Sequence, residues 1–285
     1  MLNRTRIESV ADMVEFRKNG VRQPARVALV PTMGALHEGH LALVKAAHGV
    51  AQHVIVSIFV NPMQFGPQED YSRYPRVMDH DMALLSSFPH TVVFTPSAED
   101  MYPEGPSWTV ISVPGMTGTM CGLKRPGHFD GVCTVVAKLF NIVRPDFALF
   151  GQKDGQQLAI VRRMAEDLNF PVEIVGVPTV REPSGLALSS RNRYLEPHER
   201  VQAASLYRAL SAGRERFGKG ERSRRQITQA VFDVLRAAGI EAEYVALVDS
   251  RTLEPLEQVG RQPAMLALAA QIGAARLIDN VILTP

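Results

Sequence analysis

The chain has 285 residues, of which 46% are hydrophobic and 21% are charged, and its formal net charge is +2 at pH 7. This length suits one large or two modest domains, and the balance of apolar and charged residues is typical of a globular rather than a disordered protein. The small net charge gives no whole-chain attraction to nucleic acid or to an anionic membrane, so we predict neither as a partner.

The cysteines and the apolar segments narrow the class of protein further. Cys121 and Cys133 are too few for a disulfide framework or a four-cysteine zinc site. No segment approaches the roughly 20 apolar residues of a membrane span, and charged residues interrupt the apolar residues of segment 1–16, so we expect no signal peptide there. We therefore predict a cytoplasmic protein.

Short apolar, β-rich runs alternate with helical patterns through the first two-thirds of the chain. We predict strands at 26–31, 53–60, 91–95, 108–113, 147–150 and 172–177. We predict helices at 39–50, at 132–143 and from the residue after Gly151 to about 168. Alternation of this kind implies right-handed crossovers and a mostly parallel sheet. The predicted fold class is therefore α/β, with a Rossmann-like domain in residues 1–182.

The pattern changes after Pro178, where Pro183 and Gly185 suggest a domain boundary. We predict helices at 197–217 and 223–238, followed by strands at 243–248, 264–270 and 276–283. This order is typical of a smaller α+β domain with an antiparallel sheet, in residues 183–285. The basic segment 214–225 could bind nucleic acid, but we favour a solvated surface between helices.

The first motif with chemical content is PTMGALHEGH at 31–40, between a predicted strand and a predicted helix. Parallel sheets bind ligands at this place, glycines allow close approach of a ligand, and a helix N-terminus favours phosphate. If the helix begins near Leu36, His37 and His40 share one face and can donate hydrogen bonds to phosphate oxygens. The alternatives are a zinc pair or two structural histidines.

Two further motifs fit a polyphosphate ligand. GQKDGQQ at 151–157 follows another predicted strand, and it offers Lys153 for phosphate and Asp154 for ribose hydroxyls. LSSRN at 188–192 offers two hydroxyls and the guanidinium of Arg191. Alone, the segment 151–157 could instead be a solvated turn, and the segment 188–192 could be a helix cap with a surface arginine.

Gln64 lies in NPMQF at 61–65, after the second predicted strand. Its amide is an uncharged donor and acceptor that suits a hydroxylated ligand, although a polar turn residue is the alternative. Because all four motifs follow strands or the domain boundary and suit one task, we interpret them together as a nucleoside triphosphate site.

The HxGH turn and the downstream SSR resemble the HIGH and KMSKS motifs of the nucleotidyltransferase and class I aminoacyl-tRNA synthetase superfamily. More closely, the chain resembles the pantoate–β-alanine ligase (pantothenate synthetase) family. The resemblance covers about 27–195, and the ending ARLIDN extends it to the carboxyl terminus. It rests on PTMGALHEGH, SIFVNPMQF, YPR, RPGHFDGV, KDGQQL, VGVPTVRE and LSSRNRYL, in this order.

The resemblance implies a Rossmann-like amino domain, a smaller carboxyl domain that acts as a lid, and a homodimer. It also implies the reaction. ATP and pantoate give a bound pantoyl adenylate and pyrophosphate, and the amine of β-alanine then attacks the acyl carbon to give pantothenate and AMP. Mg²⁺ is expected with ATP, and the substrates are the expected partners.

The resemblance also implies roles for individual residues. Catalytic roles fall on His40, His37, Lys153 and Arg191. Gln64 and Gln157 would bind pantoate, Gln64 would also border β-alanine, and Asp81 is the candidate metal ligand. The implied ATP-binding residues are Met33, Gly34, Ala35, Leu36, His37, Glu38, Gly39, His40, Gly151, Gln152, Lys153, Asp154, Val180, Leu188, Ser189, Ser190 and Arg191.

The resemblance implies a general-acid role for His40. The negative charge of the phosphates instead favours a hydrogen-bond donor that stabilises the α-phosphate and the departing pyrophosphate. Three positions depart from the family pattern. Gln152 stands where glutamate is usual, Gly155 where an aromatic residue is usual, and His80 interrupts an acidic run at 79–81. Two alternatives stay open. The HxGH turn alone permits another HxGH nucleotidyltransferase, although Gln64 and Gln157 argue against it, and the departures permit a nucleotide-binding scaffold without turnover.

Overall fold

The computed structural model describes residues 6–21, 24–67, 69, 71–105 and 108–285. By internal contacts the chain forms two compact units. Unit 1 comprises Met1–Gly118, Gly122–Gly151 and Ile160–Val177, and unit 2 comprises Thr119–Cys121, Gln152–Ala159 and Pro178–Pro285. The first five residues, which belong to the segment expected not to be a signal peptide, lie outside the described residues. The division into domains 1–182 and 183–285 stays a prediction.

Unit 1 contains a six-stranded sheet in the order β1-β4-β3-β2-β5-β6, and all of its strand pairs are parallel. The strands are β1 (Arg6–Ile7), β2 (Val27–Thr32), β3 (His53–Ile58), β4 (Thr91–Phe94), β5 (Phe147–Gly151) and β6 (Glu173–Val177). The strand order reverses between β2 and β5, which is the switch point at which such sheets bind ligands. The predicted Rossmann-like parallel sheet is confirmed.

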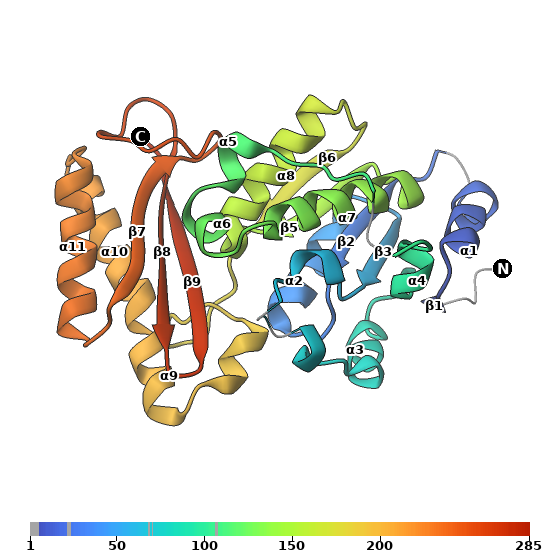
Figure 1. The fold of residues 1–285 in the computed structure, drawn as a ribbon, viewed down its shortest axis with the longest axis horizontal. Helices are drawn as coiled ribbons and strands as arrows, with labels where there is room; N and C mark the ends of the chain where they lie inside the picture. The colour runs from blue at the N-terminus through green and yellow to red at the C-terminus, as the bar shows by residue number, and fades with distance from the viewer. Residues whose placement is uncertain (1–5, 22–23, 68, 70, 106–107) are drawn as a thin grey trace. The chain divides into compact units, whose positions relative to one another are not determined.

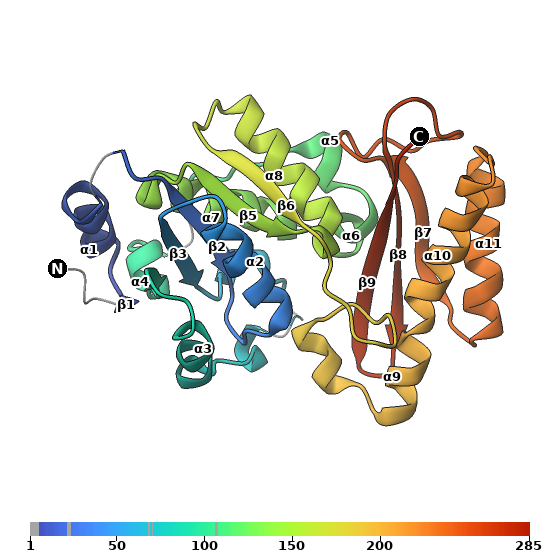
Figure 2. The ribbon, with the colours of Figure 1, turned by 180° about the vertical axis from the view of Figure 1, so that it is seen from behind.

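Helices cover both faces of this sheet because its strands are apolar on both faces. Leu43, Val44 and Ala47 of α2 pack with Ala28 and Val30 of β2 on one face. Figure 1 shows α7 in front of the sheet, and Figure 2, from the opposite side, shows α2 in front of it. The longer helices are α2 (Glu38–His48), α3 (Met78–Leu85), α7 (His128–Val143) and α8 (Gly155–Asp167). The shorter ones are α1 (Val10–Glu15), α4 (Ala98–Met101), α5 (Pro114–Thr117), α6 (Met120–Lys124), a π-helical segment (Phe16–Gly20) and 3-10 segments at Pro62–Gln64, Tyr71–Arg73 and Gln152–Asp154.

Unit 2 contains a three-stranded antiparallel sheet in the order β7-β8-β9. Its strands are β7 (Ala242–Asp249), β8 (Ala264–Ile272) and β9 (Ala275–Leu283), and its helices are α9 (Pro197–Ala203), α10 (Ser205–Gly218), α11 (Arg224–Ala237) and a 3-10 segment (Ser190–Tyr194). Leu210 of α10, Val231 and Leu235 of α11 and Leu266 of β8 form a buried core, each at most 1% exposed. Apolar residues recur at helical spacing in α10 and α11, which places them on the face of each helix that packs into this core. The predicted α+β arrangement is confirmed.

Some predicted elements differ from the structure. Segment 108–113 is not a strand: Trp108 is 91% exposed, and the backbone N–H of Ile111 donates to the hydroxyl of Thr134 rather than to a neighbouring strand. The apolar run alone gave the wrong prediction, because a strand also needs a partner for its backbone groups. The predicted helix 197–217 is two helices that meet at Ala204. Within the described ranges, no helix is long and apolar enough to cross a membrane.

Candidate active site

The turn after β2 has a constrained backbone. The hydroxyl of Thr32 donates to the carbonyl of Ser57 at 2.8 Å and accepts the N–H of Gly34 at 3.2 Å. Gly34 has φ +81° and Ala35 has φ +51°, so two successive residues adopt the left-handed region. Glycine is required at 34, since a Cβ there would lie 2.9 Å from Ile58. The sequence of the turn is therefore restricted by its backbone conformation.

Asp81 holds this turn from the first turn of α3. One carboxylate oxygen accepts the N–H of Ala35 at 2.9 Å, and the other accepts the N–H of Leu36 at 2.7 Å. The side chain belongs to a residue that is only 1% exposed, so these charge-assisted bonds form away from water. Both oxygens thus each accept one backbone N–H of the turn. Its role as a metal ligand stays a prediction.

His37 and His40 lie next to each other, but not as two residues of one helix. The helix α2 begins at Glu38, and His37 is its N-cap with an extended backbone (φ −149°). Its Nδ1 accepts the N–H of Gly39 at 3.1 Å, while Nδ1 of His40 accepts the N–H of His37 at 3.3 Å. The helix therefore does not begin near Leu36, which was the condition for the two histidines to share a helical face, because the imidazole of His37 serves as the cap.

These caps fix the tautomers of both rings. Because each Nδ1 accepts a backbone N–H, the neutral rings of His37 and His40 carry their hydrogen on Nε2. The ring centroids lie 4.1 Å apart, so the two rings are in direct contact. No group of three or more histidine, cysteine or acidic side chains suited to a metal ion occurs within the part of the chain that the structure describes.

Gln64 is buried and its amide orientation is determined. Its Nε2 lies 2.9 Å from Sδ of Met33, and its Oε1 accepts from the amide of Asn61 at 3.2 Å. Asn61 in turn donates to the carbonyl of Gly131 and accepts the hydroxyl of Tyr102 at 2.8 Å. Burial raises the pKa of Tyr102 to about 12, so its phenol is a neutral donor. The contact between Gln64 and Met33 links one implied pantoate residue to one implied ATP residue.

The backbone of Gln64 is held by residues from the RPGHFDGV segment. His128 Nδ1 lies 2.8 Å from the Gln64 carbonyl, and its Nε2 lies 2.9 Å from the guanidinium of Arg125. Arginine is always a donor, so Nε2 accepts and the Nδ1–H donates to Gln64. Arg125 also pairs with Glu69 at 2.6 and 2.7 Å. Burial alone would raise the pKa of Glu69, but the hydrogen bond and charge of Arg125 outweigh burial and lower the pKa.

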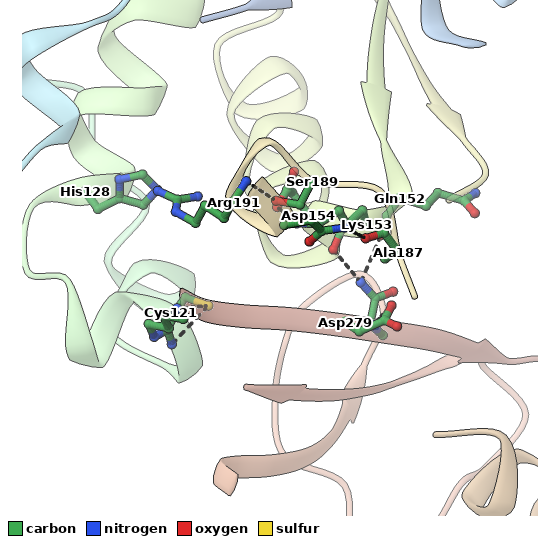
Figure 3. A network of polar contacts seen from close by, with 12 residues as sticks. Cys121, His128, Gln152, Lys153, Asp154, Ala187, Ser189, Arg191 and Asp279 are labelled. Carbon is green, nitrogen blue, oxygen red and sulfur yellow. Dashed lines mark hydrogen bonds and ion pairs between the residues drawn. The ribbon is translucent and has the colours of Figure 1, made fainter. Parts of the chain in front are cut away.

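The second group of predicted residues lies in unit 2 and begins directly after Gly151, the last residue of β5 (Figure 3). Gln152, Lys153 and Asp154 form a 3-10 turn. The ammonium of Lys153 lies 3.4 Å from the carboxylate of Asp154, and their side chains are 19% and 47% exposed. The predicted phosphate and ribose residues therefore stand side by side at the start of α8.

The residues after this turn explain one departure from the family pattern. A Cβ at Gly155 would lie 2.6 Å from Sδ of Met265 and 3.0 Å from the amide nitrogen of Asn280. The neighbouring strands therefore leave no room for a side chain at this position. Gln156 is buried and binds the backbone of Cys121 and Thr119, whereas Gln157 is partly buried and stays the candidate for pantoate.

The hairpin that carries Val180 and Leu188 leads into the SSR motif. The N–H of Leu188 donates to the carbonyl of Val180 at 3.0 Å. Ser189 then caps the 3-10 segment Ser190–Tyr194, and its hydroxyl accepts the N–H of Arg191 at 3.3 Å. The predicted residues of unit 2 are thus grouped in two short segments.

Each unit therefore brings its own share of the predicted residues together. In unit 1 the HxGH turn lies against Asp81, and Met33 contacts Gln64; in unit 2 Lys153 lies beside Asp154. Sequence reasoning assigned no individual role to Asn61, Tyr102, Arg125, His128 and Asn280, which hold these residues in place. For Arg125, His128 and Asn280 the only signal in the sequence was their place in the family motifs RPGHFDGV and ARLIDN.

Comparison with known proteins identifies the family. The model of the pantoate–β-alanine ligase family matches residues 5–282. This chain belongs to that family. A pantothenate synthetase from Moorella thermoacetica is 52% identical over 278 residues, which is 97% of this chain and 98% of that protein. The resemblance inferred from the motifs is thereby confirmed.

Solved structures agree with this assignment. A crystal structure of pantothenate synthetase from Thermus thermophilus has 48% identity and a TM-score of 0.90, and the match covers 98% of this chain and 99% of that one. A pantoate–β-alanine ligase from Francisella tularensis, described as complexed with beta-gamma ATP and β-alanine, has 32% identity and a TM-score of 0.80, over 98% of this chain and 97% of that one. The ligase fold therefore extends over nearly the whole chain.

Proposed function

We propose that this chain condenses (R)-pantoate with β-alanine at the expense of ATP, through a pantoyl adenylate, and releases pantothenate, AMP and pyrophosphate. The observation that carries the proposal is the match to the pantoate–β-alanine ligase family over residues 5–282. The beta-gamma ATP and β-alanine in complex with the Francisella tularensis ligase agree with two of the substrates. The oriented HxGH turn is the feature of this chain that suits the first step.

In the first step a pantoate carboxylate oxygen attacks the α-phosphorus of ATP, and pyrophosphate leaves. The obstacles are negative charge and alignment rather than nucleophilicity. In the proposal, the Nε2–H of His40 donates to the α-phosphate oxygens or to the departing pyrophosphate, and His37 assists. The neutral tautomer supports a hydrogen-bond donor better than a general acid, because protonation at Nδ1 would remove the acceptor for the His37 N–H.

The other ATP contacts are assigned by motif. The backbone of Met33, Gly34, Ala35 and Leu36, with the start of α2, would receive the nucleotide. Lys153, Ser189, Ser190 and Arg191 would hold the phosphates. Gly151 and Asp154 would meet the ribose, and Val180 would lie near the adenine. Magnesium bound with ATP would screen the phosphate charge.

Pantoate and β-alanine are assigned to the glutamine side chains. Gln64 and Gln157 would bind the hydroxyls and carboxylate of pantoate, and the region of Gln64 would also border β-alanine. The support in this chain is that Gln64 is buried with its amide oriented by Asn61. In the second step the β-alanine amine attacks the acyl carbon, so the acyl–oxygen bond breaks and AMP leaves.

The proposal includes a homodimer, two domains with a boundary at 182–183, and a cytoplasmic location. The family resemblance supports the dimer. The two free and buried cysteines support a reducing compartment. Light scattering of the purified protein would test the dimer directly.

The reaction is tested with purified protein, ATP, magnesium, D-pantoate and β-alanine. AMP and pantothenate should form in equal amounts, and AMP formation should require pantoate. Hydroxylamine in place of β-alanine should give pantoyl hydroxamate, because only an acyl adenylate reacts in this way. ATP binding without pyrophosphate release would indicate a scaffold, and nucleotidyl transfer without hydroxamate would indicate another transferase; either result overturns the proposal.

A further inference from the structure

Asn280 of β9 contacts the Lys153 turn through two backbone carbonyls. Its amide nitrogen donates to the carbonyl of Gln152 and to the carbonyl of Lys153, both at 2.9 Å. A side-chain amide has two N–H hydrogens, so one group can make both bonds at once. Asn280 is 8% exposed, and its removal would leave two carbonyls without this donor in a place with little water.

The position of Asn280 is itself fixed by its neighbours in unit 2. It pairs with Ala267 of β8 in the antiparallel sheet. The adjacent Asp279 is almost fully buried and binds the guanidinium of Arg181 at 2.6 and 2.9 Å. Asp279 therefore resists a shift of β9 along its own axis.

Two further features belong to the surroundings of Asn280 and Asp279. The guanidinium of Arg181 lies 3.7 Å from the ring centroid of Tyr207, and it also donates to the carbonyl of Gly185. On the other side, a Cβ at Gly155 would come within 3.0 Å of the Asn280 nitrogen. The backbone of Gly155 therefore lies close to the amide of Asn280.

We infer that Asn280 is a positioning residue for adenylation, which sets the direction of the Lys153 side chain by holding the two carbonyls of its turn. The inference rests on the proposed role of Lys153 in binding the phosphates of ATP. Asn280 reaches the lysine only through the backbone. A lysine is a point charge, and its effect on the reacting phosphate depends on its distance and direction. A displacement of about 1 Å can lower the rate about 10²-fold.

A double-mutant cycle tests this inference. Asn280→Ala, Lys153→Ala and the double variant are compared with the wild-type protein for pantoate-dependent pyrophosphate release and for the KM of each substrate. Asn280→Ala should lower kcat about 10²-fold and leave the KM of β-alanine unchanged. The double variant should be no slower than Lys153→Ala, because Asn280 acts through the lysine.

The matched control is Gln271→Ala. Gln271 of β8 is also an amide that donates to a backbone carbonyl, that of Gly273, but on an exposed hairpin. This variant should keep the wild-type kcat. Melting temperatures show whether Asn280→Ala is misfolded. A second variant, Asn280→Asp, keeps the size of the side chain but removes both N–H donors, so its kcat should also fall if the Lys153 side chain is misplaced.

The outcomes are distinct. If Lys153→Ala is impaired but Asn280→Ala and Asn280→Asp are not, or if the two losses multiply in the double variant, Asn280 does not position the lysine and the inference is wrong. If Lys153→Ala keeps the wild-type kcat, the proposed role of Lys153 fails first, and the inference fails with it. If the wild-type protein forms no pantothenate, the proposed function itself is rejected.

Discussion

The carboxylate of Asp81 accepts the backbone N–H of Ala35 at 2.9 Å, although the two residues are 46 positions apart in the chain. Ala35 has a positive φ of 51°, a conformation that costs a residue with a side chain about 1 kcal/mol or more. The second oxygen of Asp81 accepts the N–H of the next residue. An anion in α3 therefore stabilises a strained turn directly before the histidine pair.

Asp81→Asn replaces one acceptor oxygen by a donor that faces a backbone N–H. We expect the free energy of unfolding to fall by about 1–3 kcal/mol and the KM of ATP to rise about tenfold, equivalent to about 1.4 kcal/mol. The magnesium concentration at half-maximal rate should stay unchanged. Initial rates over series of ATP and magnesium concentrations measure both quantities.

Asp79→Asn is the control, because Asp79 is exposed in the same helical turn and should behave like the wild-type protein. An increased requirement for magnesium with an unchanged KM of ATP would instead identify Asp81 as a metal ligand.

His40→Ala removes the proposed donor to the α-phosphate. Loss of one charge-stabilising donor should lower kcat about 10²–10³-fold, with a much smaller effect on folding, since His40 is only partly buried. His48→Ala is the matched control on the same helix. Its Nε2 lies 2.9 Å from the hydroxyl of Thr91, so this variant should lose stability and keep kcat. An unchanged rate in His40→Ala would remove the histidine from the mechanism.

Tyr102→Phe tests the chain of bonds that orients Gln64. The variant removes the phenol donor to the buried oxygen of Asn61. Because the N–H of Met63 still donates to that oxygen, the loss should cost about 0.5–1.5 kcal/mol of stability. Because Asn61 orients the Gln64 amide, the KM of pantoate should rise while the KM of ATP stays close to the wild-type value. Steady-state kinetics in both substrates provide the measurement; equal increases in both KM values would contradict a specific role at the pantoate side.

The Glu69–Arg125 pair predicts a pH dependence of stability. The pKa of Glu69 in the native state is lowered from its ordinary value of 4.5. A lowered acidic pKa contributes stability above pH 4.5, and this contribution is lost as the pH falls through the native pKa. The pair is partly exposed, so its contribution should be about 1 kcal/mol at most.

Urea unfolding of the wild-type protein and Glu69→Gln at pH 7 and at decreasing pH measures this effect. The stability difference should shrink as the pH is lowered below 4.5. A difference that stays constant over this range would show that the carboxylate contributes by packing rather than by charge.

The parallel sheet and the antiparallel sheet could be predicted because apolar runs of the right length determine them. The strand predicted at 53–60 corresponds to β3 (His53–Ile58), and the strand at 264–270 corresponds to β8 (Ala264–Ile272). The prediction failed at 108–113, where local β-propensity was present but none of the described strands pairs with the backbone. The break at Ala204 was also missed, because the apolar pattern continues from α9 into α10.

The motifs predict which residues meet the substrates, but they do not indicate what holds these residues in place. The sequence leaves open whether His37 lies inside the helix or caps it, and only coordinates distinguish these two geometries. The bonds from Asp81 to the turn and from Asn280 to Gln152 join residues 46 and 128 positions apart. No local pattern reports such distances, so residues of this kind appear in a sequence only as unexplained polar positions.

The small space at Gly155 has an evolutionary consequence. A side chain at this position would collide with Sδ of Met265 and press on the amide of Asn280. In a relative with an aromatic residue here, a neighbouring side chain must be smaller to make room for the ring. The residue aligned with Met265 is the nearest such neighbour. In aligned sequences the two positions should therefore covary in size, with a large residue at one accompanied by a smaller residue at the other.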